Sequence, residues 1–125
     1  MARIAAFIPD LLFGSRVQAA LLADGHEVEL LGNGDAVRAS LAGARVLIVD
    51  LTDDAFHGAE LVESLSAAGS LQGIRTLAFY SHVDVDARHR AEGAGFDLVV
   101  PRSRMAREGA GLVSKLAGGG DGASR

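Results

Sequence analysis

Cysteine is absent from the 125 residues of this chain. Its absence excludes disulfide bonds, thiolate metal sites and a cysteine nucleophile. Basic residues are in the minority, with 12 Lys and Arg against 16 Asp and Glu, and the formal net charge is −4. This balance gives no basic footprint for nucleic acid, so we expect no DNA or RNA partner.

A long apolar run is also missing. No stretch approaches the roughly 18 apolar residues that a membrane-spanning helix requires, and the N-terminus shows no charged and then apolar leader. We therefore expect a cytoplasmic protein that has no membrane partner. The length suits one domain, and 49% hydrophobic with 22% charged residues is an ordinary composition for a globular chain.

What the chain does contain is a regular alternation of short apolar runs and helix-like segments. The runs that predict strands lie at 3–8, 26–32, 45–50, 74–80 and 96–100. The segments that predict helices lie at 14–25, 35–43, 58–69, 84–95 and 103–117. This order predicts an α/β fold in which helices cover both faces of a parallel sheet. The run "RVLIVD" lacks polar alternation, which is typical of a central strand.

The ends of these helices are marked by capping residues. The predicted N-caps are Ser15, Asp35 and Asp84, and the predicted stops are Gly25, Gly43 and Gly95. The final string "GGGDGASR" is too rich in glycine to offset the entropy lost on ordering. We therefore expect a disordered tail over 118–125 that follows a single domain over 1–117.

Polar side chains follow four of the predicted strands, at the point where each strand ends. These residues, which we call the strand-end edge, are Asp10, Asp50, Ser81, His82, Arg102 and Ser103. In open α/β sheets, ligands bind beyond the carboxyl ends of the strands. The strand-end edge is therefore the predicted functional site.

Three strings of residues then carry a resemblance to a known family. They are "VDL" at 49–51, "YSH" at 80–82 and "AGFDLVVPRS" at 94–103. Over 3–117 the chain resembles the CheY-like receiver domain of two-component response regulators. The resemblance implies a flavodoxin-like (βα)5 fold, a three-layer sandwich with strand order 2-1-3-4-5. It also implies that Asp50 is the candidate phospho-acceptor, that Ser81 is the hydroxyl after strand four, and that Arg102 stands where receivers carry lysine.

The resemblance fails at the first strand. Counting back from "GHEV" at 25–28 puts Ile8 and Pro9 where receivers place the pair of acids that holds Mg²⁺, and Asp10 falls one residue beyond. The chain therefore resembles an atypical, stand-alone pseudo-receiver that lacks this acid pair. We expect no cofactor, with Mg²⁺ bound only if Asp10 and Asp50 cooperate.

Asp50 is open to two interpretations. Phosphoryl transfer requires a cation that neutralises the developing charge, which Mg²⁺ usually supplies. The alternative is a strand-end acid that pairs with Arg102 or accepts a hydrogen bond from Ser81. We expect a permanent pair with Arg102, because a planar guanidinium suits a carboxylate. Binding of an anionic ligand by Arg102 remains the other interpretation of that residue.

Other polar residues give weaker signals. Ser15 and Arg16, at the predicted start of the first helix, would suit an anion, because helix N-termini offer free N–H groups, but a simple cap is the favoured interpretation of Ser15. Ser81 and His82 are adjacent and lack the nucleophile-elbow pattern, so a hydrolase triad is disfavoured. His26, His57 and His89 show no metal-ligand spacing.

Three functions follow from these observations. The first is a signalling module that binds a protein partner, and the resemblance implies a face formed by helix four and strand five, with Arg88 and Arg90. The second is a true phospho-acceptor that reacts at Asp50 with a histidine kinase as partner. The third is a small-ligand binding protein of flavodoxin-like fold. We expect no enzyme activity beyond autophosphorylation at Asp50, and a monomer or weak homodimer.

Overall fold

The computed structural model describes residues 2–81 and 85–122. Its strands form one parallel sheet in the order β2-β1-β3-β4-β5. Their bounds are β1 Arg3–Phe7, β2 Glu27–Leu31, β3 Val46–Asp50, β4 Arg75–Tyr80 and β5 Leu98–Pro101. The predicted flavodoxin-like α/β fold and its strand order are confirmed.

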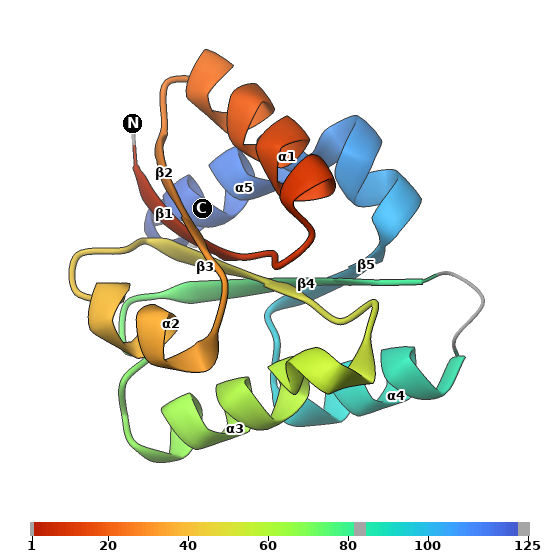
Figure 1. Ribbon diagram of the computed structural model, residues 1–125. Coiled ribbons are helices and arrows are strands. Elements are labelled where there is room, and N and C mark those ends of the chain that lie inside the picture. The colour runs from red at the N-terminus through yellow and green to blue at the C-terminus, as the bar shows by residue number, and fades with distance from the viewer. Residues whose placement is uncertain (1, 82–84, 123–125) are drawn as a thin grey trace.

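Helices cover both faces of this sheet. In the described ranges they are α1 Leu11–Ala23, α2 Gly34–Ser40, α3 Gly58–Ala67, α4 Val85–Ala94 and α5 Arg102–Gly122, with a short 3-10 helix, η1, at Asp54–Phe56. Helices α1 and α5 lie side by side on one face, whereas α2, α3 and α4 cover the other (Figure 1). The arrangement is the expected three-layer sandwich.

Strand β3 lies in the middle of the sheet and is buried along its whole length. Leu47 and Val49 pack into the core on the α2–α3–α4 side, and Val46 and Ile48 pack into the core on the α1–α5 side. Because both faces of the strand are covered, neither side needs polar residues. This burial explains the unbroken apolar run that ends at Asp50.

The starts of two helices differ from the sequence prediction. Helix α1 begins after Asp10, whose Oδ1 accepts hydrogen bonds from the backbone N–H groups of Leu12 at 3.0 Å and Phe13 at 3.1 Å. The predicted cap Ser15 is therefore wrong, because Ser15 lies inside the helix. The two leucines at 11 and 12 are 74% and 77% exposed, so these first two residues of the helix do not follow its buried-face pattern.

Helix α2 shows a similar shift. Its N-cap is Asn33, whose Oδ1 accepts from the Ala36 N–H at 2.8 Å, and not the predicted Asp35. Asn33 and Asp35 are both good capping residues, and the sequence offers both within one turn. The predicted stops Gly25 and Gly95 are confirmed, since both adopt positive φ just after their helices end.

Helix α5 extends beyond its predicted end. It runs to Gly122 instead of Ala117, and the remaining residues of the predicted tail, 123–125, lie outside the described part of the chain. The predicted cap Asp84 lies outside it as well. Although α5 is 21 residues long, no helix in the described ranges is long and apolar enough to cross a membrane.

Candidate functional site

The residues of the strand-end edge come together because parallel strands end at one side of the sheet. Asp50 is the last residue of β3 and lies opposite Phe79 of β4, and Tyr80 lies opposite Pro101 of β5. Ser81 directly follows Tyr80, and Arg102 directly follows Pro101 and begins α5. Asp10 caps α1 after β1. Four separate connections thus place an acid, a hydroxyl, a guanidinium and a second acid along one edge.

Asp50 is the most buried of these groups, with only 1% of its surface exposed. Its Oδ1 accepts two hydrogen bonds from Thr52, one from the backbone N–H at 2.8 Å and one from the hydroxyl at 2.6 Å. Burial raises the pKa of Asp50 above its ordinary 3.8. The hydrogen bonds from Thr52 and the charge of Arg102 lower that pKa, and the charge of Asp10 raises it further.

The ion pair that the structure forms at this edge is Arg102 with Asp10, not the expected Arg102 with Asp50. The distance from Arg102 Nη2 to Asp10 Oδ2 is 3.7 Å, and both side chains are about half exposed (48% and 47%). The Arg102 guanidinium also lies over the Phe13 ring, with Cζ 4.0 Å from the centroid. Arg102 therefore influences the pKa of Asp50 through its charge, without forming an ion pair with it.

Desolvation accounts for this choice of partner. A pair with Asp50 would draw the guanidinium into the buried site, and the loss of hydration around two charges can exceed their mutual attraction. Asp10 offers a carboxylate that stays hydrated, and Phe13 offers an aromatic face beside it. The exposed pair therefore costs less desolvation than the buried one.

The two acids at this edge, Asp10 and Asp50, have different contacts. Asp10 uses Oδ1 to cap α1 and turns Oδ2 toward Arg102. Ile8, one of the two residues at the receiver acid positions, is 1% exposed and packs in the core on the α1–α5 side. In residues 2–81 and 85–122, no group of three or more His, Asp or Glu side chains is placed to hold a metal ion. Mg²⁺ in proteins is usually held by one or two carboxylates and several waters, so Asp10 and Asp50 are the carboxylates of this edge on which Mg²⁺ binding would depend.

The remaining predicted site residues are more dispersed. Ser81 is half-buried behind β4, and Ser103 is exposed in the first turn of α5. Ser15 and Arg16 lie within α1 and not at its N-terminus, so the anion site predicted from a helix start at these residues is lost. His82 lies outside the described residues.

Thr52, which also follows the third strand, was not predicted to take part in the site. An acid followed two residues later by threonine is a local signal, because Asp side chains commonly accept from the backbone N–H two residues on. In the structure the Thr52 hydroxyl also donates to this carboxylate, so Asp50 Oδ1 accepts two hydrogen bonds from Thr52.

Comparisons with known proteins agree with this geometry. No protein-family model matches the chain, and no curated protein matches its sequence. Solved structures match closely in shape. The receiver domain of the Francisella response regulator 1452 superposes with a TM-score of 0.80 at 11% identity, covering 94% of this chain and 97% of that one.

Two further structures give the same result. A CheY-like receiver domain protein from Methanospirillum hungatei JF-1 has a TM-score of 0.77 at 17% identity, with 94% of each chain covered. The receiver domain of the response regulator NarL from Mycobacterium tuberculosis has a TM-score of 0.72 at 19% identity, covering 93% of this chain and 95% of that one.

The strand order and the two helical layers define a flavodoxin-like α/β protein. Within that class, the chain has the CheY-like fold of response-regulator receiver domains. At these identities the likeness establishes the fold, so the chemistry of the site must be argued from its own residues.

Proposed function

We propose that this protein is a pseudo-receiver: a receiver-like signalling domain that acts by binding a protein partner, without ordinary Mg²⁺-dependent phosphorylation of Asp50. The observation that carries the proposal is that both oxygens of the Asp10 carboxylate already have partners. Asp10 is the acid nearest to the receiver metal positions, and its carboxylate is taken up by the α1 cap and by Arg102. Asp10 is therefore not free to share a cation with Asp50.

The state of Asp50 supports the same proposal. An acceptor carboxylate must present an ionised oxygen to an incoming phosphoryl group. Here one oxygen already accepts two hydrogen bonds from Thr52, and burial raises the pKa of the group. The two hydrogen bonds reduce the nucleophilic character of that oxygen.

Receiver domains act through protein partners, and we assign that role to this chain. The α4–β5 face is one proposed partner surface. Its arginines are half exposed, although Arg90 already pairs with Glu60 of α3 at 2.7 Å and Arg88 with Glu92 of α4 at 3.3 Å. A partner on this face would meet charges that are partly compensated.

A phosphate mimic tests the proposal directly. The protein is titrated with beryllium fluoride, and separately with acetyl phosphate, with and without Mg²⁺, while the Asp50 and Ser81 amides are followed by NMR. A conventional receiver domain treated in parallel shows that the reagents are active. We expect no saturable Mg²⁺-dependent shift at either amide. Saturable shifts that vanish in Asp50→Asn would overturn the proposal.

That opposite outcome defines the alternative function. Asp50, Ser81 and Arg102 lie on one edge in the order that the receiver resemblance implies, which favours a phospho-acceptor paired with a histidine kinase. In that case enzyme activity would be limited to autophosphorylation at Asp50. A small-ligand binding protein is the third candidate, and a compound that shifts the strand-end amides without Mg²⁺ would favour it.

A further inference from the structure

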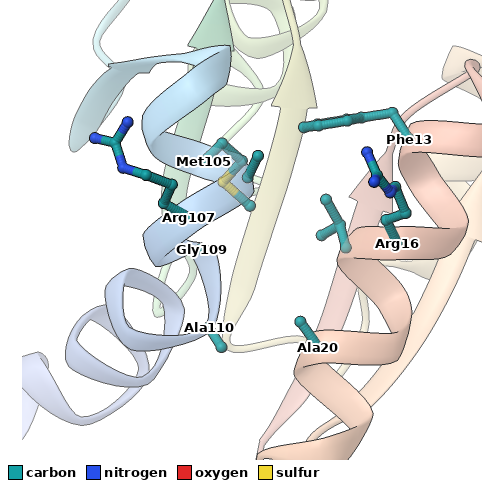
Figure 2. A pocket seen from close by; sticks show the side chains of 9 residues that line it. Phe13, Arg16, Ala20, Met105, Arg107, Gly109 and Ala110 are labelled. Carbon is teal, nitrogen blue, oxygen red and sulfur yellow. The ribbon is translucent and has the colours of Figure 1, made fainter.

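A groove runs between α1 and α5, on the face of the sheet opposite α2, α3 and α4 (Figure 2). Its volume is about 290 Å³. Its apolar walls are formed by Phe13, Val17 and Ala20 from α1 and by Met105, Gly109 and Ala110 from α5. This volume is at the small end of ligand sites, so it suits one or two apolar side chains better than a whole cofactor.

The charge of the groove is opposite to that of the chain. Ala106 and two arginines, Arg16 and Arg107, complete its lining, and no acidic residue of the described ranges lines it. The Arg16 guanidinium lies on the groove side of α1, whereas that of Arg107 is turned away from α1 (Figure 2). Within the described residues Arg16 makes no ion pair, and Arg107 has only a loose one with Glu108 at 3.6 Å. A cationic groove on a chain of net charge −4 favours an acidic partner.

One exposed apolar side chain extends this surface along α1. Leu12 is among the four large hydrophobic residues that are exposed in the described ranges. Leu12, 77% exposed, precedes Arg16 by one helical turn, and Arg16 precedes Ala20 by another. The line of residues 12, 16 and 20 therefore continues the groove toward the strand-end edge.

We propose that the α1–α5 groove binds an acidic amphipathic helix of a partner protein. A helix places apolar side chains along one stripe, which matches an elongated apolar groove between two helices. Its apolar side chains enter between Val17 and Met105, and its carboxylates pair with Arg16 at the rim. The inference rests on the proposed function, since it names the kind of partner and the face that an interaction module would use.

A second copy of this chain fits the groove poorly. A two-fold symmetric dimer would place the same face on both subunits, so the interface would contain two copies of the Arg16 and Arg107 charges. Like charges brought together in this way destabilise an interface. The charge of the groove thus selects an acidic partner over self-association.

The test uses two synthetic peptides of about 16 residues, long enough to form a helix on binding. Both carry the same leucine stripe; one has glutamate on its polar face and the other has lysine. The unphosphorylated full chain is titrated with each and followed by NMR. We expect the glutamate peptide to give saturable shifts at the amides of Val17, Ala20, Met105 and Gly109. The lysine peptide should bind at least about tenfold more weakly.

Two pairs of variants locate the binding. Arg16→Glu reverses the charge of the rim, and Arg38→Glu makes the same change at an exposed arginine of α2, on the opposite side of the sheet. Ala20→Leu fills the groove, and Ala19→Leu adds the same side chain at the neighbouring exposed position of α1, which does not line the groove. We expect Arg16→Glu and Ala20→Leu each to weaken glutamate-peptide binding about tenfold, and both controls to bind as the wild type does. Circular dichroism confirms that all four variants fold.

Three results would overturn the proposal. The first is equal affinity for both peptides, and the second is that Ala19→Leu and Ala20→Leu weaken binding of the glutamate peptide equally. The third is a concentration-dependent shift of the groove amides without peptide, which would assign the groove to a second copy. Shifts confined to α4 and β5 would reject this groove and leave the proposed function intact. The fate of Asp50 is decided separately by the beryllium fluoride experiment.

Discussion

Arg102 Nη2 lies 3.7 Å from Asp10 Oδ2, whereas the buried Asp50 accepts its hydrogen bonds from Thr52. The two acids are therefore held in different ways. Asp10 is exposed, caps a helix and faces a cation, whereas Asp50 is buried and bound by its own loop. This difference makes the ionisation of Asp50 the property to measure.

The first prediction concerns the charge of Arg102. Because that charge lowers the pKa of Asp50, Arg102→Gln should raise the pKa. The measurement is a ¹³C NMR titration of the Asp50 carboxyl. Arg104→Gln is the matched control, since Arg104 also lies at the start of α5 but pairs with Glu108. An unchanged Asp50 pKa in Arg102→Gln would mean that solvent screens the two groups from each other.

The second prediction concerns the hydroxyl of Thr52. Its hydrogen bond to Asp50 stabilises the ionised carboxylate, so Thr52→Val should raise the pKa of Asp50 while the backbone N–H bond remains. Thr52→Ser keeps the hydroxyl and should leave the pKa close to that of the wild type. The same NMR titration measures both. Equal pKa values in the valine and serine variants would show that the hydroxyl does not contribute.

The third prediction concerns stability against pH. The folded-state pKa of Asp50 lies above its ordinary 3.8, so the folded chain holds this proton more tightly than the unfolded chain. The stability that the protonated group confers is complete below pH 3.8 and is lost as the pH rises through the folded-state pKa. Asp50→Asn cannot ionise and should escape that loss.

Asp50→Asn should therefore melt at a higher temperature than the wild type at pH 7, and the difference should shrink as the pH falls through the folded-state pKa toward 3.8. Thermal unfolding followed by circular dichroism over a pH series measures it. Asp53→Asn, at an exposed neighbouring acid, is the control and should show no such trend. A difference that is constant across the series would contradict the raised pKa.

The fourth prediction concerns Gly58 at the start of α3. A Cβ there would lie 2.6 Å from Leu51 Cδ2, 2.7 Å from Val49 Cγ1 and 3.2 Å from the Asp50 carbonyl oxygen. Gly58→Ala should therefore destabilise the fold by about 1–3 kcal/mol, because α3 must move away from β3. Gly93→Ala in α4 meets open space and should stabilise by up to about 1 kcal/mol. Urea unfolding measures the stability of both variants. A gain in stability for Gly58→Ala as well as for Gly93→Ala would contradict the close approach of α3 to β3.

The fifth prediction concerns His26, which is 8% exposed and connects the start of β1 to α5. Its Nδ1 accepts from the Ala2 N–H at 3.2 Å, so its Nε2 carries the proton and donates to Ser114 Oγ at 2.9 Å; that hydroxyl donates to Asp24 at 2.7 Å. Ser114→Ala removes this acceptor and should cost about 1–3 kcal/mol.

Ser15→Ala is the control for Ser114→Ala, because Ser15 is an exposed serine in another helix. It should change stability by less than about 0.5 kcal/mol. Urea unfolding of both variants measures the difference. A cost for Ser15→Ala as large as that for Ser114→Ala would also contradict the finding that Asp10, and not Ser15, caps α1.

Much of the fold follows from local patterns. The apolar run that ends at Asp50, the helix-like segments between the runs and the stops at Gly25 and Gly95 predict an α/β sheet that the structure confirms. Periodicity and glycine conformation are properties of neighbouring residues, so a single sequence displays them. The sequence did not predict the first turn of α1, because Leu11 and Leu12 face solvent and do not follow the periodicity of the buried face.

By itself the sequence determined the strand order, through its resemblance to receivers, and the edge at which Asp10, Asp50, Ser81 and Arg102 gather. Only the tertiary structure decided which acid Arg102 faces, that Thr52 binds Asp50 twice, and that α1 and α5 enclose a groove. The physical reason is that a pattern reports which residues are buried, whereas a pairing depends on side-chain reach and desolvation between distant parts of the chain.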